Sequence, residues 1–306
     1  MSKVCILGVF VADTAYRADR APRMGETVMG KSFALGPGGK GSNQAVAAAR
    51  AGADVTFISR LGDDDFADLA MSTWEKAGVT PAVTRDGDAY TGAAYIFIED
   101  ASGDNAIIIA PGAANDISAA DVDAHADAIR GAKVFVTQLE QPIPAAQHAL
   151  QMAREAGVAT ILNPAPAADL SSGLLRLVDY CTPNESEAEA LTGVKVETLD
   201  DARRAGDALL GRGVGAALIT LGAQGALLHT ADASEHVPAF DAGAVVETTG
   251  AGDAFNGGFA AALAEGRPPL EAARFGCAAA SISVTRPGTA PAMPGRDEIE
   301  ALLGRH

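Results

Sequence analysis

A short glycine-rich run in the last third of the chain carries the residue types that phosphoryl transfer to an alcohol needs. This run, Glu247–Gly257, reads ETTGAGDAFNG and predicts a short strand over Gly243–Val246, a glycine turn and a helix that begins at Asp253. A helix N-terminus attracts anions through its unpaired N–H groups, and Gly250 and Gly252 leave those groups open. An anion hole beside an ionised carboxylate supplies donors for the phosphoryl group and a base for the hydroxyl. The plainer interpretation is a glycine turn in which Asp253 merely caps the helix.

A second glycine-rich loop, Gly36–Asn43, leads into a helix predicted over Asn43–Ala51. Its sequence, GPGGKGSN, satisfies the spacing Gly-x-Gly-x-x-Gly of dinucleotide-binding folds. That motif belongs directly after the first strand of its fold, whereas the first strand here ends near Leu7. Lys40 is followed by glycine, which also differs from the phosphate-binding loop of nucleoside triphosphatases. We therefore interpret the loop as one that presents amides, Lys40 and Asn43 to a polyhydroxyl substrate.

Polar residues follow several other predicted strands. Asp13 comes after the first strand, and Glu140 follows a buried strand near the middle of the chain. Asn184 and Glu187 lie one helical turn apart, a spacing suited to holding hydrated Mg²⁺ through water. The run 220–225, TLGAQG, is either a plain hairpin or a cradle for a nucleotide. Each feature alone is a common turn or helix-cap residue, but together they favour one site at the carboxyl ends of parallel strands.

Composition narrows the classes of partner. The chain has 306 residues, of which 48% are apolar and 20% charged, the balance of a globular protein. Its net charge of −16 argues against nucleic acid or an anionic membrane as a partner, although a glycine-rich nest can still bind a phosphate. Cys5, Cys181 and Cys277 show no paired spacing, and no stretch approaches a membrane span. We expect a cytoplasmic protein without disulfides or zinc.

Apolar runs suited to buried strands alternate with amphipathic or alanine-rich helices along most of the chain. Strands are predicted over Val4–Leu7, Val55–Ile58, Val134–Val136, Thr160–Leu162 and Ala216–Thr220. Further helices are predicted over Phe66–Ala77, Ala119–Ile129, Ala145–Ala156, Ser186–Leu191, Asp201–Gly211, Leu270–Ser283 and Arg296–Leu302. This alternation predicts an α/β fold with a mainly parallel sheet covered on both faces. Segments 13–35 and 90–110 are rich in β-formers and turns, so we expect a small sheet that serves as a lid, a dimer contact or both.

These motifs together resemble the ribokinase-like family of carbohydrate kinases, and the resemblance runs from Gly8 to about Leu303. Gly36–Arg50 is similar to the first signature of the family, and Glu247–Gly257 is similar to the second. Asn184-x-x-Glu187 resembles its magnesium and phosphate motif. The ribokinase branch, rather than the fructokinase or adenosine kinase branches, is the one most similar at Asn163–Ala167, Thr182–Glu185, Val284–Arg286 and Gly25–Val28.

The resemblance implies a single ribokinase-like α/β domain over residues 1–306, with a β-sheet lid through which two copies pair. Asp253 would be the base, and Gly250, Ala251 and Gly252 would form the anion hole. Sugar binding is implied for Asp13, Gly39, Lys40, Gly41, Ser42, Asn43, Glu140 and Asp253. ATP binding is implied for Asn184, Thr220, Leu221, Gly222, Ala223, Gln224, Gly225, Gly252, Asp253 and Cys277. A monovalent cation, typically potassium, is implied at Glu247, Thr249, Ser283, Arg286, Gly288 and Ala292, and magnesium is implied at Asn184 and Glu187 through water.

The chain departs from the pattern of the family at two positions. Val11 stands where the ribokinase branch carries an asparagine in its N-terminal sugar motif, and Glu247 stands where the cation site usually has an aspartate. Val11 either lines the sugar pocket and leaves one substrate hydroxyl without an amide partner, or only packs at a strand end. Because glutamate is longer than aspartate, Glu247 should change the geometry of the cation site and its preference among ions.

We therefore expect an ATP-dependent kinase that phosphorylates a primary hydroxyl of a small sugar, with D-ribose as the first candidate. A kinase for another pentose, a ketose or a nucleoside is the alternative within this class. Outside the class, the alternative is a sugar-binding sensor that keeps the fold without catalysis. The intact Asp253 with its glycines argues against the sensor.

Overall fold

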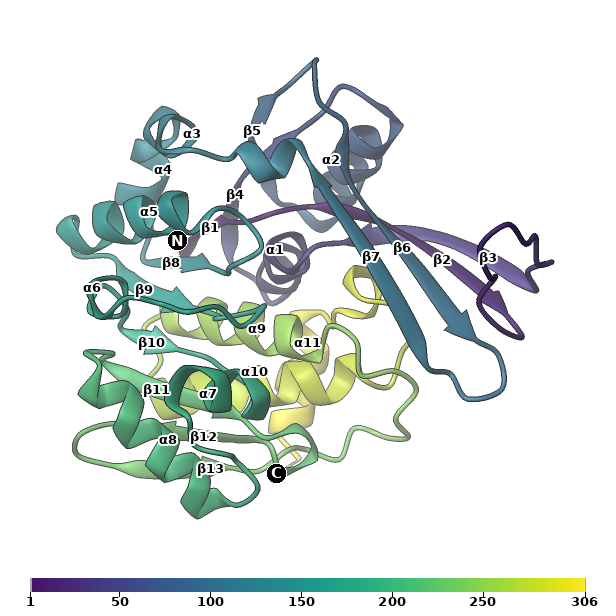
Figure 1. The fold of residues 1–306 in the computed structure, drawn as a ribbon. Helices are drawn as coiled ribbons and strands as arrows, with labels where there is room; N and C mark the ends of the chain where they lie inside the picture. The colour runs from purple at the N-terminus through teal and green to yellow at the C-terminus, as the bar shows by residue number, and fades with distance from the viewer. Residues whose placement is uncertain (1, 306) are drawn as a thin grey trace.

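The computed structural model describes residues 2–305, which form a nine-stranded and a four-stranded sheet (Figure 1). The large sheet has the order β13-β12-β11-β10-β9-β8-β1-β4-β5. Its strands are β1 (Lys3–Leu7), β4 (Asp54–Leu61), β5 (Thr80–Arg85), β8 (Val134–Thr137), β9 (Ala159–Leu162), β10 (Tyr180–Cys181), β11 (Ala216–Thr220), β12 (Ala226–His229) and β13 (Ser234–Val237). Pairing is parallel from β11 through to β5, while β12 and β13 add an antiparallel edge. The expected mainly parallel sheet is confirmed.

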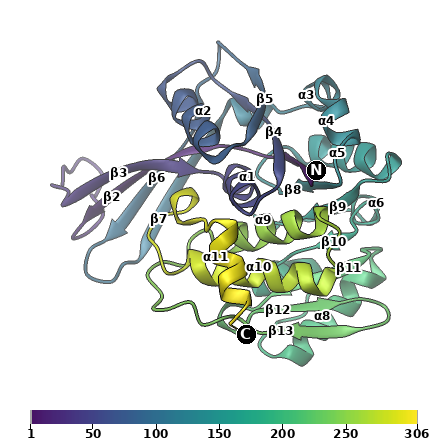
Figure 2. The same cartoon turned by 180° about the vertical axis from the view of Figure 1, so that it is seen from behind.

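Helices cover both faces of this sheet (Figures 1 and 2). One face carries α1 (Lys40–Arg50), α2 (Asp65–Ala77), α9 (Ala251–Ala264), α10 (Pro269–Ser283) and α11 (Arg296–Leu303). The other carries α3 (Ala119–Ala124), α4 (Ala126–Arg130), α5 (Ile143–Glu155), α6 (Ser172–Leu175), α7 (Glu185–Thr192) and α8 (Leu199–Gly211). In β1, Val4 and Ile6 pack on the first face and Cys5 and Leu7 on the second, as the strand period of two requires. Within residues 2–305, every helix is too short or too polar to cross a membrane.

Three local expectations were wrong. The segment 243–246 is a loop, because Val246 N–H donates to the carbonyl of Val284 and both of its valines remain exposed, without a neighbouring strand. Helix α9 begins at Ala251, two residues before Asp253, after Gly250 adopts a left-handed conformation (φ 82°). The predicted helix 119–129 is divided into α3 and α4 at His125, whose backbone leaves the helical region.

Close contact between α1 and α9 determines where the polar residues of both helices lie. A Cβ added to Gly257 of α9 would be 2.4 Å from the Cβ of Ala47 and 2.8 Å from the carbonyl oxygen of Gln44. Only a glycine allows the helices to approach this closely without displacement. The start of α1 is therefore held against the first turn of α9.

The four-stranded sheet extends to one side of the main body (Figures 1 and 2). It has the order β3-β2-β6-β7 and consists of β2 (Val11–Ala18), β3 (Ser32–Gly38), β6 (Thr91–Glu99) and β7 (Asn105–Gly112). The pairing of β2 with β6 is parallel and the other two pairings are antiparallel. The small sheet expected from the two β-rich segments is therefore present.

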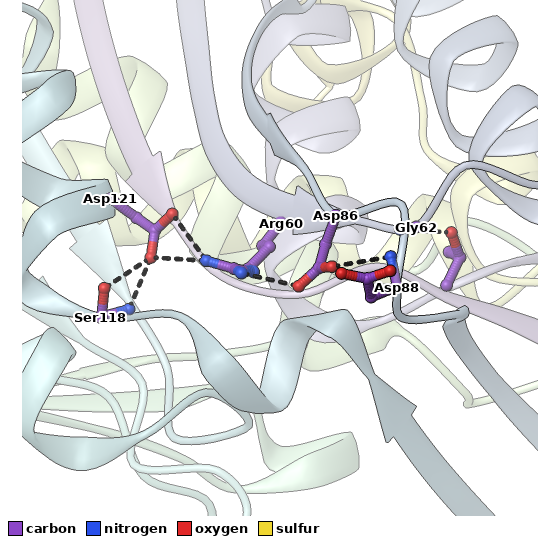
Figure 3. Close-up of polar contacts among 7 residues, drawn as sticks. Arg60, Gly62, Asp86, Asp88, Ser118 and Asp121 are labelled. Carbon is purple, nitrogen blue, oxygen red and sulfur yellow. Dashed lines mark hydrogen bonds and ion pairs between the residues drawn. The ribbon is translucent and has the colours of Figure 1, made fainter.

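Polar contacts hold the base of this sheet against the large one. At the start of β6, Thr91 N–H donates to Asp64 (2.7 Å), and Thr91 Oγ1 accepts from the N–H of Gly62 (3.0 Å). Nearby, Arg60 of β4 donates to Asp86 after β5 (2.7 Å) and to Asp121 of α3 (3.3 Å), as Figure 3 shows. The chain between β5 and β6 is thus fixed at both ends.

Candidate active site

The site lies where the carboxyl ends of the central parallel strands meet the first turns of α1 and α9. A pocket of about 140 Å³ opens there. It is lined by Lys40, Asn163, Ala165, Thr182, Asn184, Glu187, Thr220, Gly250, Gly252, Asp253 and Asn256. Residues from both signatures therefore face the same cavity, as expected for an α/β sheet.

The first turn of α9 offers backbone donors to this pocket. Gly252 and Asp253 lie in the first turn of α9, so the residues four positions before them are outside the helix and their N–H groups have no helical acceptor. The N–H of Ala251, in contrast, donates to the carbonyl of Thr248 (3.2 Å). A Cβ added to Gly252 would meet no atom within 4 Å, so this glycine leaves open space beside the amides. An anion can approach these N–H groups, with Lys40 supplying positive charge from the opposite helix.

Asp253 is buried and its carboxylate is held by two amide groups. Asn43 Nδ2 donates to Oδ2 and Gln44 Nε2 donates to Oδ1, each over 3.0 Å. Burial raises the pKa of Asp253, while the charge of Lys40 and the two amide donors act in the opposite direction. A carboxylate of raised pKa beside backbone donors is suited to accept a proton from an alcohol.

Acidic side chains gather on the other side of Asp253. Glu140 Oε2 accepts from the N–H of Lys40 (2.8 Å), at the start of α1. Burial raises the pKa of Glu140 to about 7, and the nearby charges of Asp253 and Asp13 add to this effect. Burial also raises the pKa of Asp13 to about 6. Asp13, Lys40, Asn43, Glu140 and Asp253 are thus brought together, and their acceptors suit a substrate rich in hydroxyl groups.

Other residues expected at the sugar have different surroundings. Ser42 is fully buried, and its hydroxyl accepts from the indole N–H of Trp74 (2.9 Å) in the core. A Cβ added to Gly41 would be 2.7 Å from the Cα of Gly8, so Gly41 allows close backbone packing. Gly39 precedes α1 with φ 88°, a conformation that favours glycine. Val11 is 7% exposed at the start of β2.

The turn after β11 forms a hairpin with β12. Thr220 lines the pocket, Leu221 is buried, and Gly222–Gln224 form a short 3₁₀ turn that ends at Gly225 (φ 94°). Cys277, in α10, is buried with its sulfur 4.0 Å from the carbonyl oxygen of Val237. The segment is therefore a hairpin, and its turn lies beside the pocket through Thr220.

Asn184 and Glu187 are engaged with each other at the N-terminus of α7. Asn184 Oδ1 accepts from the N–H of Glu187 (2.8 Å), and Glu187 Oε2 accepts from the N–H of Asn184 (2.9 Å). This reciprocal pair caps the helix. Both side chains also line the pocket, so capping fixes two oxygen-bearing groups at its edge.

The segments expected at a monovalent cation lie side by side. Glu247 Oε2 accepts from the N–H of Gly288 (2.8 Å), and Glu247 N–H donates to the carbonyl of Val284 (3.1 Å). The carbonyls of Ser283 and Thr289 accept from the N–H groups of Arg286 and Ala292, and Thr249 is exposed in the same loop as Glu247. Carboxylate and carbonyl oxygens of this kind suit a hard cation.

Four polar residues of the site were not predicted: Gln44, Asn163, Thr182 and Asn256. All are buried, and each hydrogen-bonds to another member of the group. Asn163 and Thr182 come directly after β9 and β10. A position soon after a buried strand is the signal that identified Glu140, and it could have identified these two residues as well. Gln44 and Asn256 lie inside helices, where their sequence carries no such signal.

The fold and this site together define a class: a buried carboxylate beside a helix N-terminus is suited to move a phosphoryl group onto an alcohol. The chain matches the model of the pfkB family carbohydrate kinases over residues 1–296. The protein therefore belongs to the pfkB family, and it is an ATP-dependent carbohydrate kinase with the ribokinase-like fold.

Individual relatives agree with this assignment. The ribokinase of Haemophilus influenzae is 40% identical over 299 residues, which cover 97% of each protein. The deoxyribokinase of Salmonella typhi is 35% identical over 302 residues, which cover 98% of each. The solved structure of Arabidopsis thaliana ribokinase, complexed with ribose and ATP, matches with a TM-score of 0.92 and 32% identity over 98% of each chain.

Proposed function

We propose that the protein transfers the γ-phosphoryl group of ATP to the primary hydroxyl of D-ribose, with Asp253 as the general base. The observation that carries this proposal is the buried carboxylate of Asp253, oriented by two amides at the edge of a donor-lined pocket. Asp253 accepts the hydroxyl proton as the oxygen attacks phosphorus. The N–H groups of Gly252 and Asp253, with Lys40, stabilise the charge on the migrating group.

The remaining assignments follow the two sides of the pocket. Asp13, Asn43 and Glu140 bind the hydroxyls of the sugar, and the turn that follows Thr220 binds the nucleotide. Asn184 and Glu187 hold Mg²⁺ through water, because both present oxygens at the edge of the pocket. When bound, Mg²⁺ neutralises charge on the ATP phosphates.

Potassium fits the oxygen donors of Glu247 and the carbonyls near Gly288. When bound, it adds positive charge close to the anion hole. Glu247 lies three residues before Gly250, so the carboxylate anchors the loop that leads into α9. Glutamate is longer than the aspartate usual at this position, and the carboxylate of Glu247 reaches the N–H of Gly288. This contact suits Glu247 to anchoring the loop.

Deoxyribose is a second candidate substrate for two reasons. Val11, if it lines the pocket, offers no amide to one substrate hydroxyl, and one of the similar enzymes is a deoxyribokinase. Val11 pairs with Gly38 in the ladder between β2 and β3, and it lies two residues before Asp13 on the same face of its strand. A Cβ added to Gly92 would be 3.0 Å from Val11 Cγ1, so the valine also packs against the start of β6. The position of Val11 is therefore compatible with lining the sugar pocket and with packing against β6.

The small sheet also suits pairing between two copies of the chain. Strand alternation and register put five apolar side chains on one face, all of them exposed: Tyr16, Phe33, Leu35, Tyr95 and Ile108. The ring centroids of Tyr16 and Phe33 are 5.1 Å apart, and those of Tyr16 and Tyr95 are 5.5 Å apart. A continuous apolar face of this kind marks an interface, and we propose a homodimer through the lid.

We expect Asp253→Asn to lower kcat by at least about 10²-fold, the usual scale for loss of a general base. Asparagine keeps the size of the side chain, so folding and ATP affinity should be retained. Steady-state kinetics and an ATP titration measure the two effects separately. Turnover close to that of the wild type in a folded Asp253→Asn variant would remove Asp253 from the mechanism.

Replacing tetramethylammonium with potassium should raise kcat about threefold or more, because a bound cation adds charge near the anion hole. Glu247→Gln should weaken this response while leaving the fold intact, and Glu247→Asp should retain part of it. The rate is measured against the concentration of each salt at constant ionic strength. Equal rates in potassium, sodium and tetramethylammonium would rule out a cation role for Glu247.

If Val11 lines the sugar pocket, Val11→Asn should raise kcat/KM for ribose several-fold and lower it for deoxyribose. A hydrogen bond to one hydroxyl contributes about 0.5–1.5 kcal/mol, which sets this scale. The wild type and Val11→Asn are both tested on ribose, deoxyribose, ketoses and nucleosides. A wild type that already prefers ribose with low KM, and an unchanged preference in Val11→Asn, would leave Val11 with packing alone.

Charge placed on the apolar face of the lid should separate the dimer. Burying an unpaired carboxylate in an apolar interface is costly, so Leu35→Glu and Ile108→Glu should yield monomers. Light scattering coupled to gel filtration measures the mass, and Ala190→Glu, on the exposed side of α7, is the control. A monomeric wild type, or dimers that survive both substitutions, would contradict this interface.

A further inference from the structure

Two buried glutamines lead from the end of β8 to the carboxylate of Asp253. Gln138 Nε2 donates to Gln44 Oε1 over 2.6 Å. Gln44 Nε2 in turn donates to Asp253 Oδ1 (3.0 Å) and to Asn163 Oδ1 (3.1 Å). Both glutamines have a relative exposure of 0%, and neither lines the pocket. Their contacts with the base are therefore made inside the protein, apart from the substrates.

The same group of hydrogen bonds reaches the anion hole. Asn163 Nδ2 donates to the carbonyl of Thr182 (3.0 Å), and Thr182 Oγ1 donates to Asn256 Oδ1 (2.7 Å). Asn256 Nδ2 donates to the carbonyl of Gly252 (2.8 Å), which belongs to the same peptide unit as the N–H of Asp253. One buried chain of polar groups thus holds the carboxylate of the base and the adjacent backbone donor.

The carboxylate determines the direction of the bonds between the glutamines. An ionised carboxylate can only accept, so Gln44 must turn its NH₂ group towards Asp253 and its oxygen towards Gln138. Gln138 must then turn its own NH₂ group to Gln44. Its oxygen is left against Gly8 and Gly41, where a Cβ on Gly8 would be only 2.4 Å away.

This orientation of the two amides leaves one buried oxygen unpaired, but the opposite orientation would cost more free energy. Gln138 Oε1 is buried and has no hydrogen-bond partner within residues 2–305. Reversing both amides would direct the oxygen of Gln44 at the carboxylate of Asp253, and a charged group that loses a buried donor costs more than a neutral one. The arrangement therefore favours the ionised form of the base.

We propose that Gln44 is a positioning residue for the reaction, held in its orientation by Gln138, and that the pair keeps the carboxylate of Asp253 ionised and aimed at the substrate hydroxyl. This inference rests on the proposed role of Asp253 as general base. Burial alone raises the pKa of Asp253, and the donors from Gln44 and Asn43 oppose that rise.

Other charged groups also act on this carboxylate. Lys40, at the start of α1, favours its ionised form. Glu140, after β8, and Glu187, in α7, interact with it as like charges, and Asp13, in β2, acts on Glu140. Because glutamine is neutral, its replacement by a neutral residue leaves all these charges in place, and a change in pH profile can be assigned to the lost donor.

The test compares Gln44→Met and Gln138→Met with the wild type. Methionine matches glutamine in length but offers no N–H donor. Both variants should lose about tenfold or more in kcat, because a base that is misplaced slightly transfers protons poorly. The acid limb of kcat should move up by about one pH unit, since the ionised carboxylate loses a donor. KM for ATP should stay within about twofold of its original value, as expected when only the reacting groups are affected.

Gln141→Met is the matched control. Gln141 is also buried, in the loop after β8, but its Nε2 donates to Thr137 Oγ1 and to the carbonyl of Gln138. Its loss should destabilise the protein to a similar degree without moving the acid limb. Melting temperature and circular dichroism identify the folded variants. If Gln44→Met does not fold, Gln138→Met replaces it in the test, because Gln138 contacts the base only through Gln44.

Unmoved acid limbs in the folded Gln44→Met and Gln138→Met variants would overturn the inference, as would an equal shift in Gln141→Met; if only one of the two variants folds, its acid limb decides. The Asp253→Asn variant separates this failure from that of the proposed function. High turnover by Asp253→Asn removes the base and the inference together. Low turnover by Asp253→Asn, combined with unmoved limbs in both glutamine variants, removes the inference alone.

Discussion

Burial of the Asp253 carboxylate is the constraint on which the rest of the site depends. An ionised carboxylate inside a protein is stable only when fixed donors replace the water that it loses. Here those donors come from α1, through Asn43 and Gln44, and the first turn of α9 adds its positive end. Both helices must therefore lie in contact, which Gly257 permits by admitting Ala47 against the axis of α9. The small residues of this helix pair serve the chemistry as much as the packing.

The two sides of the site differ in what they offer a ligand. Around Glu140 and Asp13 the protein supplies acceptors, and burial holds both carboxyl groups at a raised pKa. Sugar hydroxyls can donate to such groups and replace the lost water. Around Gly252 the protein supplies N–H donors and the cation of Lys40. A chain with a net charge of −16 can accept polyphosphate because these donors act locally, whatever the overall charge.

The sequence predicted most of the sheet because buried parallel strands are continuous apolar runs, and it placed Asp253 near the start of a helix because a helix start after glycines has a recognisable composition. It missed β5 and β13, which are partly exposed and form the two edges of the large sheet. The loop at Val245 was mistaken for a strand, because β-branched residues favour strands only where a neighbouring strand exists. Ser42 was assigned to the substrate from its place in a signature, yet its position on α1 directs it at Trp74. Gln44 and Gln138 are 94 positions apart in the chain, and no local pattern indicates that they meet.

The small sheet and the site are parts of one mechanical unit. Strand β2 carries Asp13 into the small sheet, so any displacement of that sheet moves one of the two acidic groups proposed to bind the sugar. Strand β3 continues into the loop before α1, and the carbonyl of Pro37 accepts from the hydroxyl of Thr289 (2.9 Å), in the segment that also contacts Glu247 through Gly288. Contacts therefore run from the small sheet through the loop before α1 to the segment proposed for the cation. A substrate that orders Asp13 and the start of α1 will also restrain the loop before α9, because these elements share hydrogen bonds rather than a flexible linker.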